Sequence, residues 1–233
     1  ATVFDGQDLQ QILRRDFPSN ISVSRNKIDG ITFQNARSSN NGAALYAKKV
    51  DVVNSIFTDN THLASNGGGG ALYMSESTVR RSQFMNNHTF GDGGAIYSES
   101  GNDTISHCLV KNNTAEGSGG GIYSLSAKIF NSEISNNTAK IGGGIYGFPM
   151  IVNSTIVNND ADNFREGYYG GGLYLTNRNC KIYNTIVWGN RGGSYVSNVR
   201  GNTTQDFQYS ARERGAFVPS LATNIILETF NTG

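Results

Sequence analysis

The sequence lacks a strong net charge, a long apolar run and the apolar content of an ordinary core. Lysine and arginine number 19 against 18 aspartate and glutamate residues, so no long-range field favours nucleic acid or an anionic membrane. No apolar run approaches the length of a membrane span. Only 37% of residues are hydrophobic, whereas 29 of 233 are glycine, which argues against a conventional compact core. This composition favours one domain of repeats, each completed by its neighbours.

A glycine-rich stretch that ends in Tyr occurs six times and organises the chain. Its form is Gly, two small residues, Leu or Ile, then Tyr, as at residues 93–97. The tyrosines follow one another at intervals of 27, 24, 26, 23 and 28 residues, and such a period is typical of a solenoid. The six are Tyr46, Tyr73, Tyr97, Tyr123, Tyr146 and Tyr174.

The second half of each repeat ends in an Asn that follows alternating uniform and variable columns. The Asn column is Asn60, Asn87, Asn113, Asn137, Asn159 and Asn190. Three residues before it stand Phe57, Phe84, Val110, Ile134, Ile156 and Val187, and five before it stand Ser55, Ser82, Cys108, Ser132, Ser154 and Thr185. Between these two lies a mixed column, which includes Gln83 and Glu133. Uniform columns alternating with mixed ones predict strands with one face inward.

The alternation breaks once in each repeat, which predicts a corner. The residues at the break are Asn54, Arg81, His107, Asn131, Asn153 and Asn184. Asn tolerates the left-handed backbone that such corners need. We therefore expect about three short strands and three corners per repeat. The Asn that closes each coil should form an internal ladder of amides, and the glycine pairs should permit positive φ and close backbone approach.

These patterns predict an all-β fold, a right-handed parallel β-helix. Only parallel pairing of each strand with its counterpart one repeat on places like residues in register, and parallel crossovers are overwhelmingly right-handed. A leucine-rich horseshoe lacks its consensus here, and the Gly triplets exclude helical repeats. We expect one domain over residues 1–233, with N-terminal coils or a cap at 1–41, six regular coils at 42–190 and an irregular C-terminal cap at 191–233.

The two ends leave alternatives open. Asp8 to Phe17 has the spacing of an amphipathic capping helix, but its flanks favour strands, which we prefer. In the C-terminal part, strand-like pieces remain at residues 207–209 and 224–227. Cys108 and Cys180 lie three coils apart in this alignment, about 14 Å along the axis, beyond the Cα separation of about 7 Å that a disulfide allows. Two free thiols are expected.

Several of these motifs resemble known bacterial repeat proteins. Gly-Gly-Ala-Ile at residues 93–96, with Phe-x-x-Asn at 57–60 and 84–87, resembles the repeat pair of the chlamydial polymorphic outer membrane proteins. Residues 184–190, with Tyr209-Ser210 and Asn224-Ile225 downstream, are similar to secreted β-helix proteins of Bacteroidetes-type bacteria. The resemblance implies a secreted or surface-displayed bacterial protein, often an adhesin or surface-layer component. The start at Ala1 is expected of a processed mature chain or of a domain boundary.

No catalytic constellation emerges from the columns, and we expect no cofactor. Glycan-cleaving β-helices need carboxylates with an Arg, Lys or His on one outward strip. The outward columns that contain Asp51 and Glu133 hold one acid each, and His62, His88 and His107 fall in different columns without metal-ligand spacing. The longest insertion, residues 160–169, reads as a solvated loop, with a Ca²⁺ site at Asp160, Asp162 and Asn163 as the alternative.

The tyrosines are the candidate binding residues. Leu or Ile before each Tyr should point inward, which sends the six tyrosines outward in one file about 4.8 Å apart. The file either stiffens its face or forms an aromatic strip for a sugar chain or partner protein, with Tyr168 and Tyr169 at one end.

We interpret the chain as a non-catalytic extracellular or cell-surface module, structural or adhesin-like, that binds a protein or glycan and neither binds nucleic acid nor enters a membrane. The alternatives are a glycan-binding or glycan-active β-helix protein, and a self-assembling filament or surface-layer subunit that associates through its terminal coils.

Overall fold

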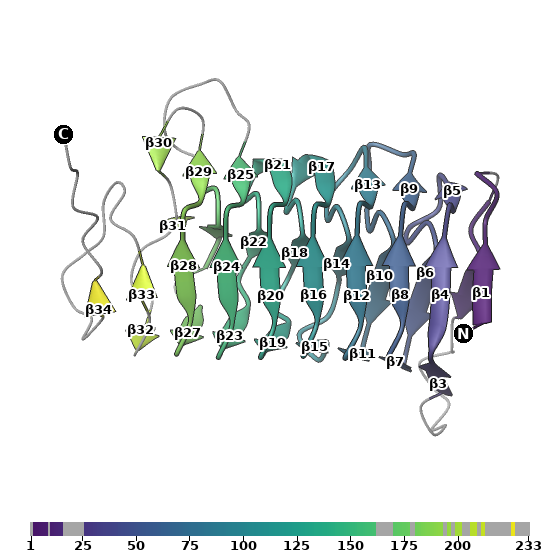
Figure 1. Ribbon diagram of the computed structural model, residues 1–233, viewed down its shortest axis with the longest axis horizontal. Coiled ribbons are helices and arrows are strands. Elements are labelled where there is room, and N and C mark those ends of the chain that lie inside the picture. Colours follow the sequence, from purple (N-terminus) through teal and green to yellow (C-terminus); the bar gives the residue numbers. More distant parts are fainter. Residues whose placement is uncertain are drawn as a thin grey trace.

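The computed structural model shows a parallel β-solenoid built from short strands (Figure 1). It describes residues 2–8, 10–15, 26–161, 170–177, 180–192, 195–196, 199–201, 206–208, 211–212 and 225–226. Within these residues there are strands, turns and bends but no helix, and so none long and apolar enough to cross a membrane.

The strands form four sheets that run along the solenoid axis, here named A to D. Sheet A, which faces the viewer in Figure 1, contains β1 (Thr2–Asp5), β4 (Ile31–Gln34), β8 (Ile56–Thr58), β12 (Gln83–Met85), β16 (Leu109–Lys111), β20 (Glu133–Ser135), β24 (Thr155–Val157), β28 (Ile186–Trp188), β33 (Ala211–Arg212) and β34 (Ile225–Ile226). Sheet B contains β2 (Leu13–Arg15), β6 (Leu45–Lys48), β10 (Leu72–Ser75), β14 (Ile96–Ser98), β18 (Ile122–Ser124), β22 (Ile145–Gly147), β26 (Leu173–Leu175) and β31 (Val199–Gly201).

Sheet C contains β3 (Asn26–Asp29), β7 (Val50–Val53), β11 (Thr78–Arg80), β15 (Thr104–Ser106), β19 (Lys128–Phe130), β23 (Met150–Val152), β27 (Lys181–Tyr183) and β32 (Asp206–Gln208). Sheet D contains β5 (Arg37–Ser38), β9 (Thr61–His62), β13 (His88–Thr89), β17 (Thr114–Ser118), β21 (Thr138–Ile141), β25 (Asp160–Ala161), β29 (Arg191–Gly192) and β30 (Tyr195–Val196). Each coil visits the sheets in the order B, C, A, D, and in the described chain about seven coils follow one another.

The coil has four strands, so the expectation of about three was wrong. The strand that the sequence did not indicate is the short one of sheet D, directly after the closing Asn. Its inward column contains His62 and Thr89 in two coils and then Ala115, Ala139 and Ala161. Because this column holds polar side chains in some coils and the small side chain of Ala in the others, it gives no alternation of large apolar and polar residues. The strand is also just two residues long in most coils.

The register places like residues side by side, as expected. Leu72 pairs with Leu45 on one side and Ile96 on the other, and Phe84 pairs with Phe57 and Val110. Among the strand pairs of the described chain, β29 and β30 are antiparallel and the rest are parallel. Parallel in-register stacking therefore turns each sequence column into a column in space.

The core is a set of fully buried columns inside the coil. Those of sheets B, C and A run from Leu45 to Leu173, from Val52 to Ile182 and from Phe33 to Val187, and each residue in these ranges of the columns is shielded from solvent. In the N-terminal coils the sheet A column is aromatic: the rings of Phe33, Phe57 and Phe84 stack with centroids 4.8 and 4.6 Å apart. Later coils replace these rings with Val and Ile, so the interior is packed by aliphatic side chains there.

The closing asparagines form the expected internal ladder. From Asn60 to Asn159, each Nδ2 donates to the Oδ1 of the Asn one coil on, at 2.9 Å in every step. The same Oδ1 accepts from the backbone N–H of the preceding Asn, and Nδ2 also donates to a backbone carbonyl, such as Phe84 O for Asn113. All six side chains are buried, and the ladder satisfies their polar atoms.

The corners have the backbone that the sequence indicated. All six residues at the sheet C–sheet A corner have φ between 48 and 55°. At the glycine corner, Gly69, Gly93 and Gly119 also have positive φ, and the next glycine is needed for space: a Cβ on Gly94 would lie 1.9 Å from Gly120 O. Both expected roles of the glycine pair are therefore present.

Within the segment from Asp8 to Phe17, Leu13–Arg15 form the strand β2, as preferred, while Leu9, Asp16 and Phe17 lie outside the described residues. At the C-terminal end, the strand-like pieces coincide with β32 and β34, and β31, β32 and β33 continue sheets B, C and A in parallel. The coil geometry thus continues past residue 190, where the sequence period has ended.

Candidate functional site

The six predicted tyrosines form one file along the outside of sheet B. Each Tyr occupies the same register position in its strand. The Leu or Ile directly before it and the residue directly after it both point inward. Successive rings are nearly parallel, with centroids 5.0, 5.0, 4.6, 5.1 and 5.3 Å apart from Tyr46 to Tyr174. The outward direction and the stacking are as expected.

The file is less exposed than the sequence indicated. Tyr73 is buried, with 6% of its surface accessible, and the other five are half-buried. The glycine turn that precedes the strand lies against the file, since a Cβ on Gly68 would come within 2.8 Å of Tyr97 Cδ2. Ring faces are covered by neighbouring rings, so what the file offers to solvent is ring edges and hydroxyls.

Burial changes the ionisation of these phenols. It raises the pKa of Tyr123 to about 12, with the neighbouring Tyr97 and Asp92 as further causes. The pKa values of Tyr73, Tyr97 and Tyr146 are also raised, in each case mainly by burial. Glu99 hydrogen-bonds Tyr73 and adds to the shift there.

Arginines occupy the register positions at both ends of the file. Arg14 pairs with Tyr46, and its guanidinium carbon lies 4.0 Å from the centre of that ring, a cation–π contact. Arg200 pairs with Tyr174 at the other end. Tyr168 and Tyr169, predicted to extend the file, lie outside the described residues.

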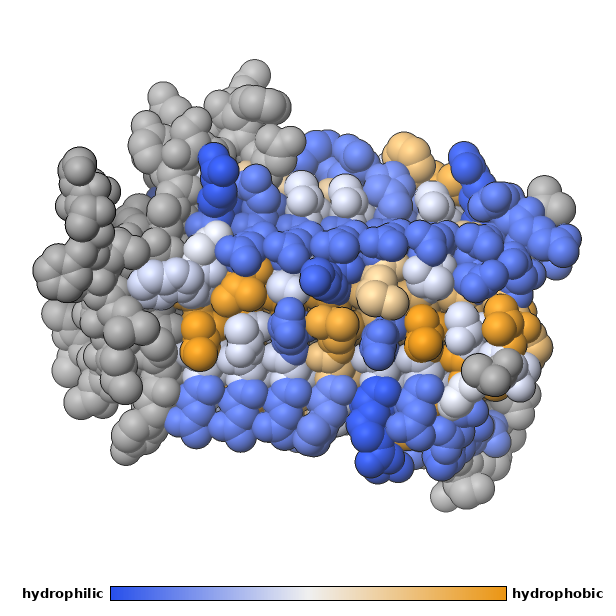
Figure 2. Space-filling view, in the orientation of Figure 1, coloured by the Kyte–Doolittle hydropathy of each residue, from blue (hydrophilic) through white to orange (hydrophobic). Residues whose placement is uncertain are grey.

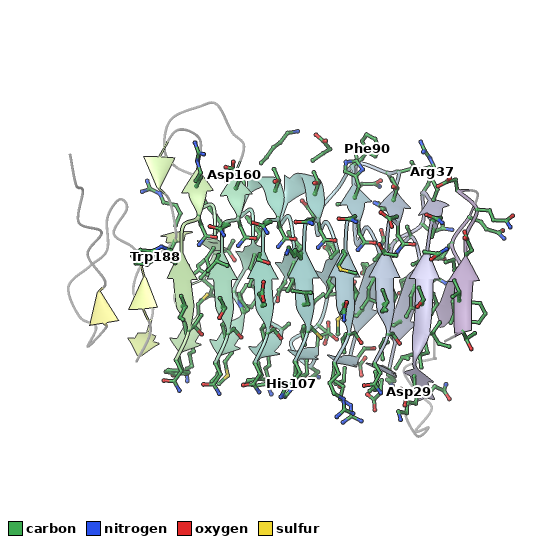
Figure 3. All side chains as sticks on the ribbon, viewed as in Figure 1. Asp29, Arg37, Phe90, His107, Asp160 and Trp188 are labelled. Atoms are coloured by element: carbon green, nitrogen blue, oxygen red, sulfur yellow. The ribbon has the colours of Figure 1, made fainter. Side chains whose placement is uncertain are left out.

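The alternative Ca²⁺ site cannot be placed, because Asp162 and Asn163 also lie outside the described residues. Asp160 is described: it begins β25, near the top of Figure 3. In the part of the chain that the structure describes, no group of three or more His, Cys, Asp or Glu residues could hold a metal. Cys108 and Cys180 are free and buried, as expected, and burial raises the pKa of each thiol to about 11.

The face of sheet A is a second surface, which the sequence reasoning did not single out. It is a band of mixed hydropathy between two hydrophilic rows that follow the corners on either side (Figure 2). At the sheet C–sheet A corner, a hollow is lined by Arg81, Gln83, His107, Leu109, Asn131 and Glu133. His107 lies on this edge in Figure 3. The sequence does contain a signal for this hollow: Arg81 and His107 stand in a column that is otherwise Asn.

Comparison with known families gives a match in the middle of the chain. Residues 81–99 and 107–125 match the family model of the Chlamydia polymorphic membrane protein repeat. Each matched segment runs from the corner before sheet A, through the buried Asn, to the Tyr strand or just beyond it. No curated protein and no solved structure matches the chain. The match covers these two short segments and, together with the β-solenoid, fits a β-helix repeat protein similar to the chlamydial polymorphic membrane proteins.

Proposed function

We propose that the chain is a non-catalytic, extracellular, adhesin-like module that presents a repetitive surface to a protein or a glycan. The in-register stack carries this proposal: each outward column recurs once per coil, about 4.8 Å apart, on a scaffold held by buried ladders. The matched repeat belongs to a family of membrane-associated surface proteins, which supports display at a cell surface. We also expect the solenoid to be right-handed.

The tyrosine file is the proposed contact strip on this surface. Its ring edges and hydroxyls form a straight row bounded by Arg14 and the position of Arg200. Such a row suits a sugar chain or an extended peptide, because aromatic rings with polar edges bind both. The competing account is that the stack only stiffens sheet B.

Replacing Tyr97 and Tyr123 with Ser distinguishes the two accounts. Binding of the labelled protein to a panel of cells and immobilised glycans is measured beside the melting temperature. Lost binding with a retained melting temperature supports the contact strip, whereas a lower melting temperature with unchanged binding supports stiffening alone. Tyr183→Ser, which removes a half-buried tyrosine of sheet C, is the matched control.

Self-association is the second candidate, and the N-terminal end of sheet A favours it. All four residues of β1, the end strand, are exposed, including Val3 at 51% and Phe4 at 44%. An exposed apolar edge strand is a template for pairing with another chain. Sizing chromatography over a concentration series tests this: larger species should appear as concentration rises and should be reduced by Val3→Lys, while a monomer at every concentration would contradict it.

A further inference from the structure

Three departures from the repeat, at Arg81, His107 and Cys108, lie at one place. At the sheet C–sheet A corner, Asn occupies four of the six coils, and Arg81 and His107 occupy the other two. Cys108 replaces the Ser of the inward column in the same coil as His107. These residues line the hollow at that corner. Because the scaffold works with Asn and Ser at these positions, the departures call for another explanation.

The hollow is a grid of six side chains from three successive coils. One row is Gln83, Leu109 and Glu133, which pair with one another across β12, β16 and β20. The other row is the corner itself, Arg81, His107 and Asn131, two residues earlier in each coil. Leu109 is half-buried and forms an apolar centre, while the five polar side chains around it are exposed.

Arg81 is available as a cation. Its Nε donates to Asn54 Oδ1 at 3.1 Å, a neutral partner, which fixes the direction of the guanidinium. Asp29 forms an ion pair with Lys27 and accepts from Asn54 Nδ2 at 2.7 Å, and the charge of Arg81 is the smallest of the causes that lower the pKa of Asp29. The remaining guanidinium N–H groups are suited to a carboxylate, which Arg binds with two parallel hydrogen bonds.

His107 and Glu133 add directional polar groups. His107 Nε2 lies 3.3 Å from Asn131 Nδ2; in the tautomer in which the amide nitrogen donates to Nε2, Nδ1 carries the proton. That Nδ1–H is a second donor beside Arg81. Glu133 Oε1 accepts from Ser135 Oγ at 2.8 Å, which leaves Oε2 as an acceptor for a hydroxyl. The side-chain amides of Gln83 and Asn131 each contribute an NH₂ donor and a carbonyl oxygen acceptor.

We propose that this hollow binds a carboxylate-bearing sugar unit of an acidic glycan. Arg81 and His107 hold the carboxylate, Leu109 contacts the apolar face of the ring, and Gln83, Asn131 and Glu133 bind its hydroxyls. Glu133 offsets the charge of Arg81, so the site favours a monoanion rich in hydroxyls over a dianion such as phosphate. Glu133 is the only carboxylate among the residues that line the hollow, so the pair of carboxylates that a glycosidase uses for hydrolysis is not present there.

The experiment is calorimetric titration with four probes. They are a trigalacturonate, a sialylated trisaccharide, a neutral trisaccharide and inorganic phosphate. Either acidic sugar should bind at least tenfold more tightly than the neutral sugar and the phosphate, and the two acidic probes distinguish a hexuronate from a sialic acid as the source of the carboxylate. Equal binding of neutral and acidic sugars, tightest binding of phosphate, or no binding of either acidic sugar would overturn the proposal.

Variants locate the site. Arg81→Asn should weaken binding of the acidic probe at least tenfold, and it should fold, because Asn holds this positive-φ position in four other coils. Arg80→Asn is the matched control: it removes the same charge from the adjacent exposed residue, which does not line the hollow. Equal losses in the two variants would show a non-specific charge effect and contradict the proposal. The result is independent of the adhesin-like role, because the hollow and the tyrosine file lie on different sheets.

Discussion

Two columns of asparagine run along the same solenoid with different tolerance for change. The column that closes the coil, from Asn60 to Asn190, is buried and unbroken over six coils. The column at the sheet C–sheet A corner is exposed wherever Asn occupies it, and Arg81 and His107 replace Asn in two coils. The buried position requires an amide that donates and accepts at once, whereas the corner requires only a residue that tolerates positive φ.

The difference separates residues that hold the fold from residues that are free to acquire a function. Arg81 and His107 have φ of 50 and 55°, close to the 51° of Asn54 in the same column. The corner therefore keeps its backbone while its side chain changes.

Asn113→Ala should lower the free energy of unfolding by about 3 kcal/mol or more. It removes the hydrogen bonds of Nδ2 to Asn137 and Phe84 and leaves Asn87 without the Oδ1 that its N–H and Nδ2 share. The matched change at the exposed corner, Asn153→Ala, should cost about 1 kcal/mol, the strain of positive φ. Denaturant unfolding measures both, and equal losses would refute the distinction between the columns.

Gly94→Ala tests a position where glycine is needed because the adjacent coil leaves no room for a side chain. A Cβ there would lie 1.9 Å from Gly120 O, so the adjacent coil must shift, and we expect a loss of about 2 kcal/mol or more. Gly30→Ala is the control, since its φ is +70° but its Cβ would meet no atom within 4 Å. That change should cost about 1 kcal/mol. A larger loss at Gly30 than at Gly94 would mean that strain, not coil contact, governs these glycines.

The tyrosine file should make the protein sensitive to alkali. The pKa of Tyr123 is about 12 in the folded protein against 10.0 for an unperturbed phenol, so the unfolded chain loses its proton first. The contribution of the protonated Tyr123 phenol to the free energy of unfolding is complete below pH 10 and is lost as the pH rises towards 12. Unfolding measured across that range should show a smaller loss for Tyr123→Phe than for the unchanged protein. If the free energy of unfolding fell equally with pH in both proteins, burial would not raise the pKa of Tyr123 as described.

Cys108→Ser should have the smallest effect, in the stabilising direction. Ser55, Cys108 and Ser132 each donate a backbone N–H to the hydroxyl one coil on, at 3.1 to 3.2 Å. Ser82 faces Cys108 instead, and a thiol is a weak acceptor. Restoring the hydroxyl should raise the free energy of unfolding by about 0.5–1 kcal/mol. A lower free energy of unfolding would mean that the residues around Cys108 pack better against a sulfur atom than against a hydroxyl.

Most of the fold could be predicted because identical environments recur in each coil. The Leu or Ile before each Tyr, the Phe, Val or Ile three before each Asn, and the Asn itself repeat at one period, so parallel stacking was the arrangement that matched them. The fourth strand was missed because its inward residues change from His62 to Ala161. Strands β31 to β33 continue the sheets where the sequence no longer repeats, so their pairing had no signal in the sequence.

The candidate sites could be predicted only in part. The stacking of the tyrosines follows from alternation and register, but the burial of Tyr73 depends on how the glycine turn lies against the file, which spacing does not reveal. The hollow at Arg81 and Glu133 joins two columns that are adjacent only after the corner has folded. Searching each column separately for catalytic groups could not find it.

Hydrogen exchange of the asparagine side-chain amides, followed by NMR, tests the central distinction most directly. The Nδ2 protons of Asn87, Asn113 and Asn137 lie in the buried ladder and should exchange orders of magnitude more slowly than those of Asn153, which is exposed. Comparable, fast exchange of all four side chains would mean that the ladder does not hold the coil together and would contradict the account.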